Sequence, residues 1–343
     1  MKKKLYALFG MFFPSFKPQP ETKPLGVIPP DPESSQHYTG SQYKGNYVWS
    51  GAMNLCWTEL CQSLIHAPIA LRTEDLDALR MTNNLNHPVC TKADLDAPSY
   101  YVKAGLGPQT VATINRECRV KFPEKSFPDL RIDLGQTDLI SYAYFYKKVA
   151  YELPFIQKDV SFEGQKVAGF EAGDHQKHTV EILGYESDDR FILRLRLKNE
   201  GDELLLAKGF DTQTPGEMLK VLEAWSGHRT TSLGEEDYFK MPVLALQYRR
   251  DYPEMMGKYL DNDGFKECFI GQMFENIAFE LDETGVRAES QAVISIERGS
   301  FAHPPQRRYF YLDKPFWVIL KRKESPNPYF LLGVNNTKIM QIR

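Results

Sequence analysis

The chain has 343 residues, of which 42% are hydrophobic and 25% are charged, and these fractions are typical of a soluble globular protein. Its formal net charge is −3, so no strong field favours binding to nucleic acid or to an anionic membrane. Five cysteines are too few for a disulfide scaffold, and the composition excludes a collagen, a coiled coil, a repeat array and a multispan membrane protein.

Residues 1–42 predict a leader followed by a disordered, proline-rich linker. Three lysines after Met1 precede the apolar stretch from Leu5 to Phe13, which has the shape of a secretory signal peptide and is too short to span a bilayer. The small-x-small cleavage site of such a peptide is missing. Two locations therefore stay open: a secreted or extracytoplasmic protein, and a cytoplasmic one.

We expect one folded domain over residues 43–343, of the α+β class, with helices mainly early and strands mainly late. Apolar spacing predicts helices at 51–65 (with Ser50 as cap), 73–81, 108–119 and 215–226. Runs of strand-forming residues predict strands at 139–146, 167–170, 179–185, 191–197, 203–207, 243–248, 277–281, 309–312, 316–321 and 329–334.

No motif supports an enzyme, a cofactor site or a metal site. Asp174, His175 and His178 would need a helix to share a metal, but they lie in a polar turn. Residues 261–264 look like the start of a calcium loop, but Ile270 stands where the closing glutamate belongs. We therefore expect no enzymatic activity, no cofactor and no metal.

A segment of alternating small and large side chains follows an acidic strand end in the last third of the chain. The strand from Ile277 ends in Asp282 and Glu283, and Gly285 comes shortly after. A period of two then places only small residues on one face, namely Val286, Ala288, Ser290 and Ala292, and places Arg287, Glu289 and Gln291 on the other. Such a strand could slip between two others with little steric demand.

The order of these segments resembles the serpin family, in which an acidic-glycine hinge, a small-residue stretch, an exposed loop, a basic-Pro-Phe strand and a closing glycine-containing strand follow one another. The last two correspond to Lys314-Pro315-Phe316 and Gly333-Val334-Asn335. Upstream, residues 46–51 are similar to the family's N-x-F-x-S-P motif before the second helix, and residues 142–155 are similar to the central strand with its W-x-x-P-F exit. Residues 241–246 are similar to the L-P-K-F strand. Residues 253–260 are similar to the helix that follows this strand, and residues 264–269 are similar to the end of that helix.

The resemblance implies a large central sheet that contains 139–146 and 272–282, smaller β-layers from 179–207 and 309–340, surrounding helices and an exposed reactive loop. A protease attacks this loop, and the cut loop inserts into the large sheet as a new strand. Glu283 and Gly285 would form the hinge, and the small residues at 286, 288, 290 and 292 would enter the sheet.

Serpin spacing from the hinge glycine places the cleaved bond near residues 298–300. Arg298 is the only basic side chain there and suits the pocket of a trypsin-like protease, which would cut between Arg298 and Gly299. Counted strictly, the spacing lands on Gly299, so that the bond would join Gly299 to Ser300 and a different protease would be the target. Arg298 could also be a plain solvated loop residue.

Departures from the family pattern keep two functions open. The chain is some tens of residues shorter than a usual serpin between Ser50 and Tyr151, and Tyr151 replaces the exit tryptophan. Ala143 and Glu275 stand for the asparagine and histidine that help to control sheet opening. The protein is either an inhibitor of a target protease or a non-inhibitory serpin-fold binding or chaperone-like protein. We expect a monomer that binds no nucleic acid and spans no membrane.

Overall fold

The computed structural model describes residues 5–7, 38–123, 129–147, 150–198, 200–225, 230–284 and 307–343. They form two compact units whose segments alternate along the chain. Unit 1 consists of Met1–Ser41, Trp49–Lys147 and Tyr248–Ile277, and unit 2 consists of Gln42–Val48, Lys148–Gln247 and Ala278–Arg343. A single domain over residues 43–343 stays a prediction.

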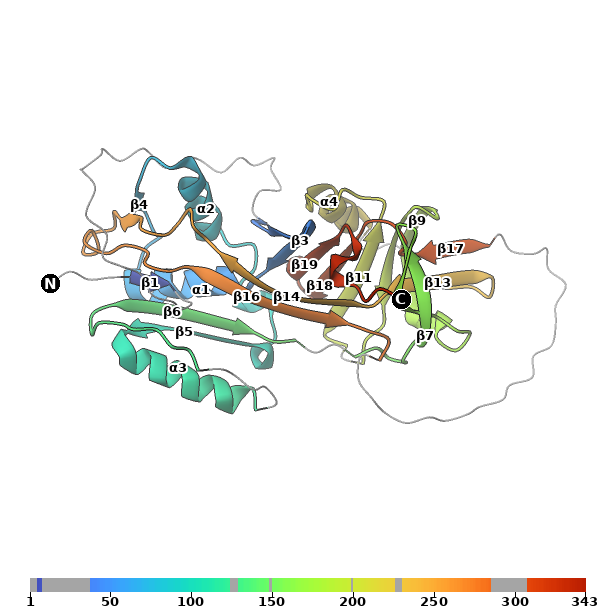
Figure 1. Cartoon of the computed structure of the whole chain (residues 1–343), viewed down its shortest axis with the longest axis horizontal. Coiled ribbons are helices and arrows are strands. Elements are labelled where there is room, and N and C mark those ends of the chain that lie inside the picture. Colours follow the sequence, from blue (N-terminus) through green and yellow to red (C-terminus); the bar gives the residue numbers. More distant parts are fainter. Residues whose placement is uncertain are drawn as a thin grey trace. The chain divides into compact units, whose positions relative to one another are not determined.

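Unit 1 contains a three-stranded sheet with helices packed against it (Figure 1). Its central strand β6 (Leu139–Phe145) pairs antiparallel with β5 (Tyr100–Leu106) along its whole length, and it pairs parallel with β1 (Leu5–Ala7) at Leu139–Ser141. The helices of this unit are α1 (Ala52–Leu60), the π-helix Cys61–Ile65, α2 (Leu76–Asn86) and α3 (Gly107–Lys121), and short 3-10 turns occupy Lys92–Asp94 and Ala97–Ser99.

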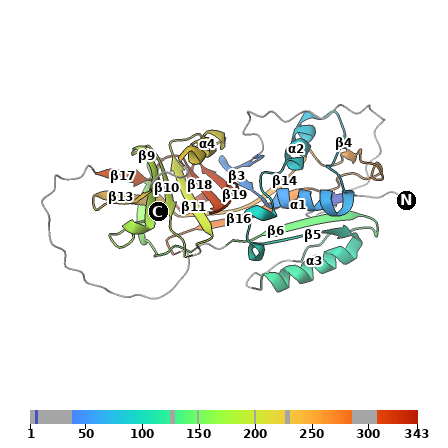
Figure 2. The same cartoon turned by 180° about the vertical axis from the view of Figure 1, so that it is seen from behind.

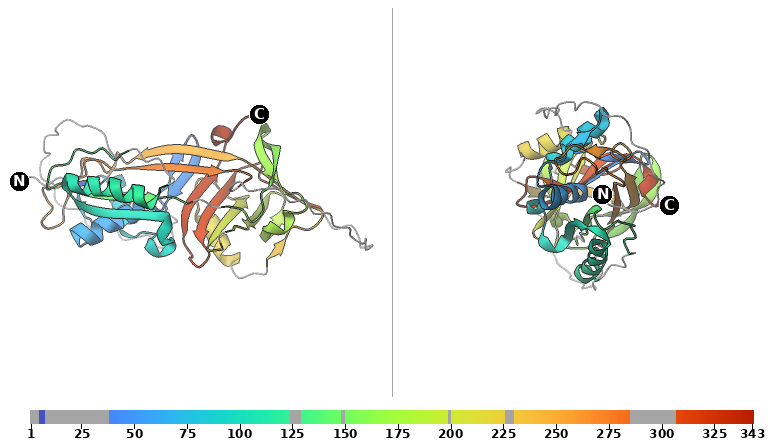
Figure 3. Two further views of the ribbon diagram at one scale, coloured as in Figure 1. Left: turned by 90° about the horizontal axis from the view of Figure 1, so that it is seen from below. Right: turned by 90° about the vertical axis from the view of Figure 1, so that its left-hand side faces the viewer.

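Strand β6 is buried on both faces, as its apolar sequence predicts. Ile140 and Tyr142 share a core with Ile114 and other residues of α3, which lies along β5 and β6 in Figure 3. On the alternate positions, the Ser141 hydroxyl donates to the carbonyl oxygen of Cys56 in α1 at 2.7 Å. Alternate residues of β6 therefore face α3 on one side of the strand and α1 on the other.

Most of an eight-stranded sheet lies in unit 2, in the order β12-β9-β10-β11-β18-β19-β3-β2. The antiparallel pairing of β11 with β18 joins two hairpin runs of the chain into this one sheet. The strands are β12 (Thr231–Ser232), β9 (Val180–Ser187), β10 (Arg190–Leu195), β11 (Asp202–Lys208), β18 (Phe316–Arg322), β19 (Pro328–Val334), β3 (Asn46–Ser50) and β2 (Ser41–Tyr43).

Helix α4 (Gly216–Trp225) lies beside this sheet, as Figure 2 shows from behind. Its last residue, Trp225, fills the space over Gly184 of β9, where an added Cβ would come within 1.7 Å of the indole ring. The small residue in the strand and the large one at the end of the helix therefore fix where α4 packs.

Three further sheets complete the described chain. A four-stranded sheet has the order β17-β13-β8-β7, and a two-stranded sheet pairs β14 (Leu244–Asp251) with β16 (Phe274–Leu281). The members of the four-stranded sheet are β17 (Arg308–Tyr311), β13 (Asp237–Pro242), β8 (Gln165–Glu171) and β7 (Ile156–Phe162). The short pair β4 (Leu71–Arg72) and β15 (Tyr259–Leu260) and the 3-10 turns Lys177–Thr179 and Thr337–Ile339 are the remaining elements.

The α+β class with helices around a large sheet is confirmed, but the membership of that sheet differs from the prediction. Strands β6 and β16 belong to the three-stranded and two-stranded sheets, whereas most of the segments expected in smaller layers build the eight-stranded sheet and β17 joins the four-stranded sheet. Local sequence predicts a strand and its buried faces, but the choice of partner strand depends on contacts between distant segments.

Two helix predictions need correction. Residues 253–260 contain turns and β15 instead of a helix, because Gly257 takes a φ of +75°, which a helix cannot continue. The helix expected at 73–81 begins later, at Leu76, since the Asp75 carboxylate accepts from the N–H groups of Asp77 and Ala78 and so caps it. The N-cap residue of α1 is Gly51 and not the predicted Ser50. The Ser50 hydroxyl still accepts a hydrogen bond from the Ala52 N–H, at 3.3 Å.

Candidate functional site

The predicted hinge and bait fall on a segment whose two flanks lie in the same unit. Glu283 is within the described chain, whereas Gly285, Val286, Ala288, Ser290, Ala292, Arg298, Gly299 and Ser300 lie outside the described residues. The flanking residues Thr284 and Arg307 both belong to unit 2. The described site is therefore the pair of anchors at the ends of segment 285–306.

The N-terminal anchor holds the acidic end of β16. The backbone N–H of Phe155 donates to the carbonyl oxygen of Glu283 at 2.9 Å, and the side-chain amide of Gln157 donates to the Glu283 carboxylate. One carboxylate oxygen of Asp282 accepts from the backbone N–H and from the hydroxyl of Thr284, each at 2.8 Å. The acidic pair thus forms a turn immediately before residue 285.

An aromatic cluster supports this anchor. Tyr151, which is 3% exposed, makes an edge-to-face contact with Phe155 at 4.9 Å between ring centroids, and Phe155 stacks on Phe170 at 5.3 Å. Burial, followed by the charges of Asp282 and Glu283, holds the pKa of Tyr151 well above its usual value. Tyr151 therefore supplies a large buried ring at the position where the family pattern has tryptophan.

The C-terminal anchor is an ion pair between neighbouring strands. Nε and Nη2 of Arg308 donate to the two carboxylate oxygens of Asp237 at 2.9 and 2.6 Å. Asp237 is buried and also accepts from the N–H of Gly234 at 2.7 Å, and its hydrogen bond with Arg308 raises the pKa of the guanidinium. Arg307 makes a more exposed pair with Glu236 at 3.0 Å. A bidentate bond of this kind fixes orientation as well as position.

Sequence reasoning missed this C-terminal anchor, although a signal for it exists. The acidic run Glu235-Glu236-Asp237 opens one strand, and the basic pair Arg307-Arg308 opens another. Opposite charges at the starts of two strand candidates favour a parallel pair, because partners in register then carry opposite charges. The structure has this register, with Asp237 opposite Arg308.

A buried carboxylate in unit 1 takes the place of the expected histidine. Glu275 of β16 is 4% exposed; it accepts from the Ser50 hydroxyl and from the Tyr252 hydroxyl, the latter at 3.1 Å. Burial raises the pKa of Glu275, while the Ser50 bond, the charge of Arg250 and the Tyr252 bond act in the opposite direction. Ala143, the expected asparagine position, lies buried in β6 and has no side-chain group that could join this network.

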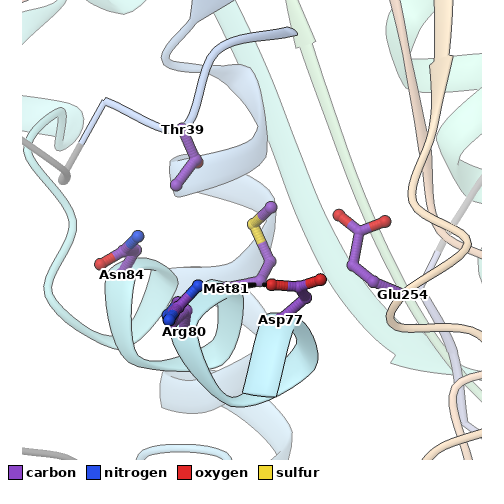
Figure 4. Close-up of a pocket in the computed structure, with 6 residues that line it drawn as sticks. All are labelled: Thr39, Asp77, Arg80, Met81, Asn84 and Glu254. Atoms are coloured by element: carbon purple, nitrogen blue, oxygen red, sulfur yellow. Dashed lines mark ion pairs between the residues drawn. The ribbon is translucent and has the colours of Figure 1, made fainter. Parts of the chain in front are cut away.

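A pocket in unit 1 is less suited to function. It is lined by Thr39, Asp77, Arg80, Met81, Asn84 and Glu254, and Figure 4 shows that none of the predicted site residues belongs to it. The ion pair of Asp77 with Arg80 spans 3.5 Å, and both side chains are largely exposed. Because these two charges compensate each other in solvent, they offer little binding energy to a charged ligand.

Two further sequence expectations concern metals and membranes. In the part of the chain that the structure describes, no group of three or more His, Cys, Asp or Glu side chains could hold a metal ion. Within the same ranges, no helix combines the length and the apolar character needed to cross a membrane.

No protein-family model and no curated protein matches the sequence. Solved structures do match the arrangement of its elements. The mouse protein-Z dependent protease inhibitor aligns with 15% identity and a TM-score of 0.52 over 86% of this chain and 91% of that chain. Serpin48 of the insect Tenebrio molitor aligns with 15% identity and a TM-score of 0.49 over 85% of this chain and 92% of its own.

A third match is thyroxine-binding globulin in complex with thyroxine, with 12% identity and a TM-score of 0.46 over 85% of this chain and 92% of that chain. The element order describes an α+β protein in which two anchors hold the residues on either side of segment 285–306. The likeness to the mouse inhibitor shows that this is the serpin fold, as the sequence motifs predict.

Proposed function

We propose that the protein is a serpin-like protease inhibitor that acts through cleavage of segment 285–306 and insertion of the cut strand between β6 and β16. The observation that carries the proposal is that these two strands belong to separate sheets: β6 pairs with β5 and, at Leu139–Ser141 only, with β1, whereas β16 pairs with β14. A strand inserted between β6 and β16 would join the two small sheets into one. Three residues separate segment 285–306 from the end of β16, so its N-terminal half has the connectivity for this position.

The energy for insertion comes from new backbone hydrogen bonds and from burial of one side-chain face. With a net contribution of about 1 kcal/mol for each hydrogen bond, a strand of roughly ten residues stabilises the cut form by on the order of 10 kcal/mol. Val286, Ala288, Ser290 and Ala292 would supply the small buried face. Arg287 and Glu289 would point away from the sheet, where a charge stays hydrated.

The proposed mechanism captures a protease during catalysis. Attack on the loop forms an acyl-enzyme, and insertion of the cut strand then carries the attached protease across the inhibitor and distorts its active site. The backbone bond from Phe155 to Glu283 would keep the base of the inserting strand in place. We further propose a trypsin-like target, a secreted or extracytoplasmic location, a monomer and no enzymatic activity of its own; N-terminal sequencing of the exported chain tests the location.

A non-inhibitory serpin-fold binding or chaperone-like protein is the second candidate, and the Glu275 network favours it. The Glu275 carboxylate joins the end of β3, through Ser50, to the residue after β14, through Tyr252. Breaking such a buried network leaves polar groups unpaired, which costs about 1–3 kcal/mol for each group. Because β16 would border the inserted strand, a network that ties β16 to β3 and to Tyr252 would resist any shift of β16 that insertion requires.

Incubation with trypsin tests the proposal. We expect mass spectrometry to find a C-terminal fragment that starts at Gly299, gel electrophoresis to show an SDS-resistant complex, and the cleaved inhibitor to unfold at least roughly 10 °C above the intact chain. Arg298→Ala should abolish the complex, while Arg287→Ala, which removes another basic residue of the same segment, should leave it. Cleavage that forms no complex and does not raise the midpoint supports the non-inhibitory candidate instead.

A further inference from the structure

The four-stranded sheet presents a row of tyrosines on its outward face, next to the C-terminal anchor of segment 285–306. The parallel register of β13 and β17 sets Tyr238 opposite Tyr309 and Lys240 opposite Tyr311, and these four residues are called the tyrosine face. The intervening pair, Phe239 and Phe310, is fully buried and must therefore point to the other side.

The rings of the tyrosine face pack against one another. Tyr238 stacks on Tyr309 with 5.6 Å between ring centroids, and Tyr309 meets Tyr311 edge to face at 5.4 Å. The ammonium group of Lys240 lies 5.0 Å from the centre of the Tyr311 ring. Tyr238 is 38% exposed, although a large aromatic side chain gains free energy from burial. The rings are preorganised by their mutual contacts and by the buried strand face beneath them.

The charges around the tyrosine face already have partners. Lys240 lies 3.7 Å from Glu171 of β8, and Lys177, which approaches the Tyr238 ring, lies 3.0 Å from Asp174. The face is thus aromatic and close to neutral overall. This composition suits a protein surface, since tyrosines dominate the binding energy of many protein interfaces, and it does not suit a polyanion such as nucleic acid, which needs uncompensated cations.

Chain length decides which protein surface can reach it. Tyr309 follows Arg298 by 11 residues, which an extended chain spans in at most about 40 Å. A protease domain of roughly 200 residues is itself about 40 Å across. We infer that the tyrosine face is a docking surface for the body of the protease that attacks segment 285–306, an inference that rests on the proposed function and adds a second contact outside the bait.

The rate at which trypsin cuts the full chain between residues 298 and 300 measures this contact. We expect Tyr309→Ala/Tyr311→Ala to lower the second-order rate constant about tenfold, the effect of losing one or two interface hot spots. Tyr309→Phe/Tyr311→Phe keeps the rings and should stay near the wild-type rate. Because the charges of the face are compensated, the rate should change less than about threefold between ~50 and ~500 mM salt.

Tyr43→Ala is the matched control. Tyr43 also has a lysine over its ring, Lys44 at 5.0 Å, but it lies on β2 of the eight-stranded sheet. This substitution should leave the cleavage rate unchanged, and the unfolding midpoints of all variants should confirm intact folding. An equal rate for the double alanine variant, or an equal loss in Tyr43→Ala, overturns the inference. Self-association of the wild-type chain that the double variant abolishes also overturns it, since the face would then bind a second copy.

The proposed inhibition can fail separately from this inference. Inhibition is judged after the cut, by the SDS-resistant complex and the raised midpoint, whereas docking is judged by the rate of the cut itself. Cleavage at 298–300 without a complex would reject inhibition and still report on the tyrosine face. Absence of any cleavage there would remove the proposed occupant and overturn both.

Discussion

The eight-stranded sheet and the two small sheets differ in how their strands are enclosed. In the eight-stranded sheet, β18 pairs with β11 on one side and with β19 on the other, and every residue of Pro328–Val334 is buried. Strand β16, by contrast, belongs to a sheet of two strands and alternates buried with more exposed residues. Strand β18 is bonded along both edges, whereas β6 is bonded to β1 only at Leu139–Ser141 and β16 pairs only with β14. The proposed insertion would therefore need fewer backbone bonds to break in the small sheets than in the eight-stranded sheet.

Ion pairs between neighbouring strands of the eight-stranded sheet also distinguish it from the small sheets. Arg194 in β10 bonds to Glu181 of β9 at 2.5 Å and to Glu203 of β11 at 2.7 Å, which links three neighbouring strands. Although burial acts to raise it, the hydrogen bonds from Arg196 and Arg194 hold the pKa of Glu181 below its usual value. The buried carboxylate of unit 1, Glu275, has its pKa shifted in the opposite direction.

The largest expected effect comes from blocking insertion. Ala288→Arg should leave the intact chain folded but abolish both the protease complex and the rise of the midpoint after cleavage, because an unpaired charge would have to enter the sheet. Glu289→Arg changes the neighbouring, outward position and should leave both unchanged. Thermal scans of the cut proteins measure the difference, and an equally stable cut form in Ala288→Arg would contradict the insertion account.

The eight-stranded sheet should respond to a change in its core more strongly than to any change in the loop. Trp317 in β18 is fully buried, contacts Tyr47 at 5.3 Å between ring centroids, and donates from its indole N–H to the carbonyl oxygen of Asp211 at 2.9 Å. Trp317→Ala should lower the free energy of unfolding of the intact chain by about 3–5 kcal/mol. Denaturant titration measures this loss, and a change below about 1 kcal/mol would show that the sheet is less tightly packed than its burial indicates.

The two buried carboxylates should give opposite pH dependences. Because the folded pKa of Glu275 is raised, its contribution to stability is complete below the ordinary glutamate value and is lost as pH rises through the folded pKa. Because the folded pKa of Glu181 is lowered, its contribution is present above the ordinary value and is lost as pH falls through the folded pKa. Glu275→Gln should flatten the dependence of the unfolding free energy on pH above the ordinary glutamate pKa. Glu181→Gln should flatten the same dependence below that pKa.

Unfolding free energies measured across this pH range test both variants, and each serves as the control for the other. Parallel profiles for the two variants would mean that neither carboxylate sets the local pH dependence. The groups around Glu275 that also bear on its ionisation are Arg250, Tyr252 and Ser50.

The smallest expected effect concerns β1. This strand pairs with β6 at Leu139–Ser141, so an inserted strand that runs the full length of β6 would have to displace three residue pairs. Deletion of residues 1–7 should therefore speed insertion after cleavage severalfold and leave the midpoint of the cut form unchanged. Stopped-flow fluorescence of a labelled loop follows the rate, and an unchanged rate would show that β1 and the inserting strand do not compete.

Most elements follow from local sequence. The periods of 3.6 and 2 were enough to predict α1, α3, α4 and strands β9, β10, β11, β18 and β19 of the eight-stranded sheet, because each element buries one face or both wherever it packs. The order of hinge, loop and closing strand was likewise sufficient to predict the serpin fold. The missed strands β5, β7 and β13 have weaker alternation and more polar residues, so their sequences resemble those of loops.

The pairing of those elements depended on contacts between segments far apart in the chain. Nothing near Leu139 indicates that β6 pairs with β1 and β5 and not with β16, because any strand edge offers the same backbone donors and acceptors. Asp237 and Arg308, 71 positions apart, meet only once β13 and β17 lie in register, and the same register assembles the tyrosine face. Periodicity therefore determines what each segment becomes, while long-range packing determines which segments meet and where a functional surface forms.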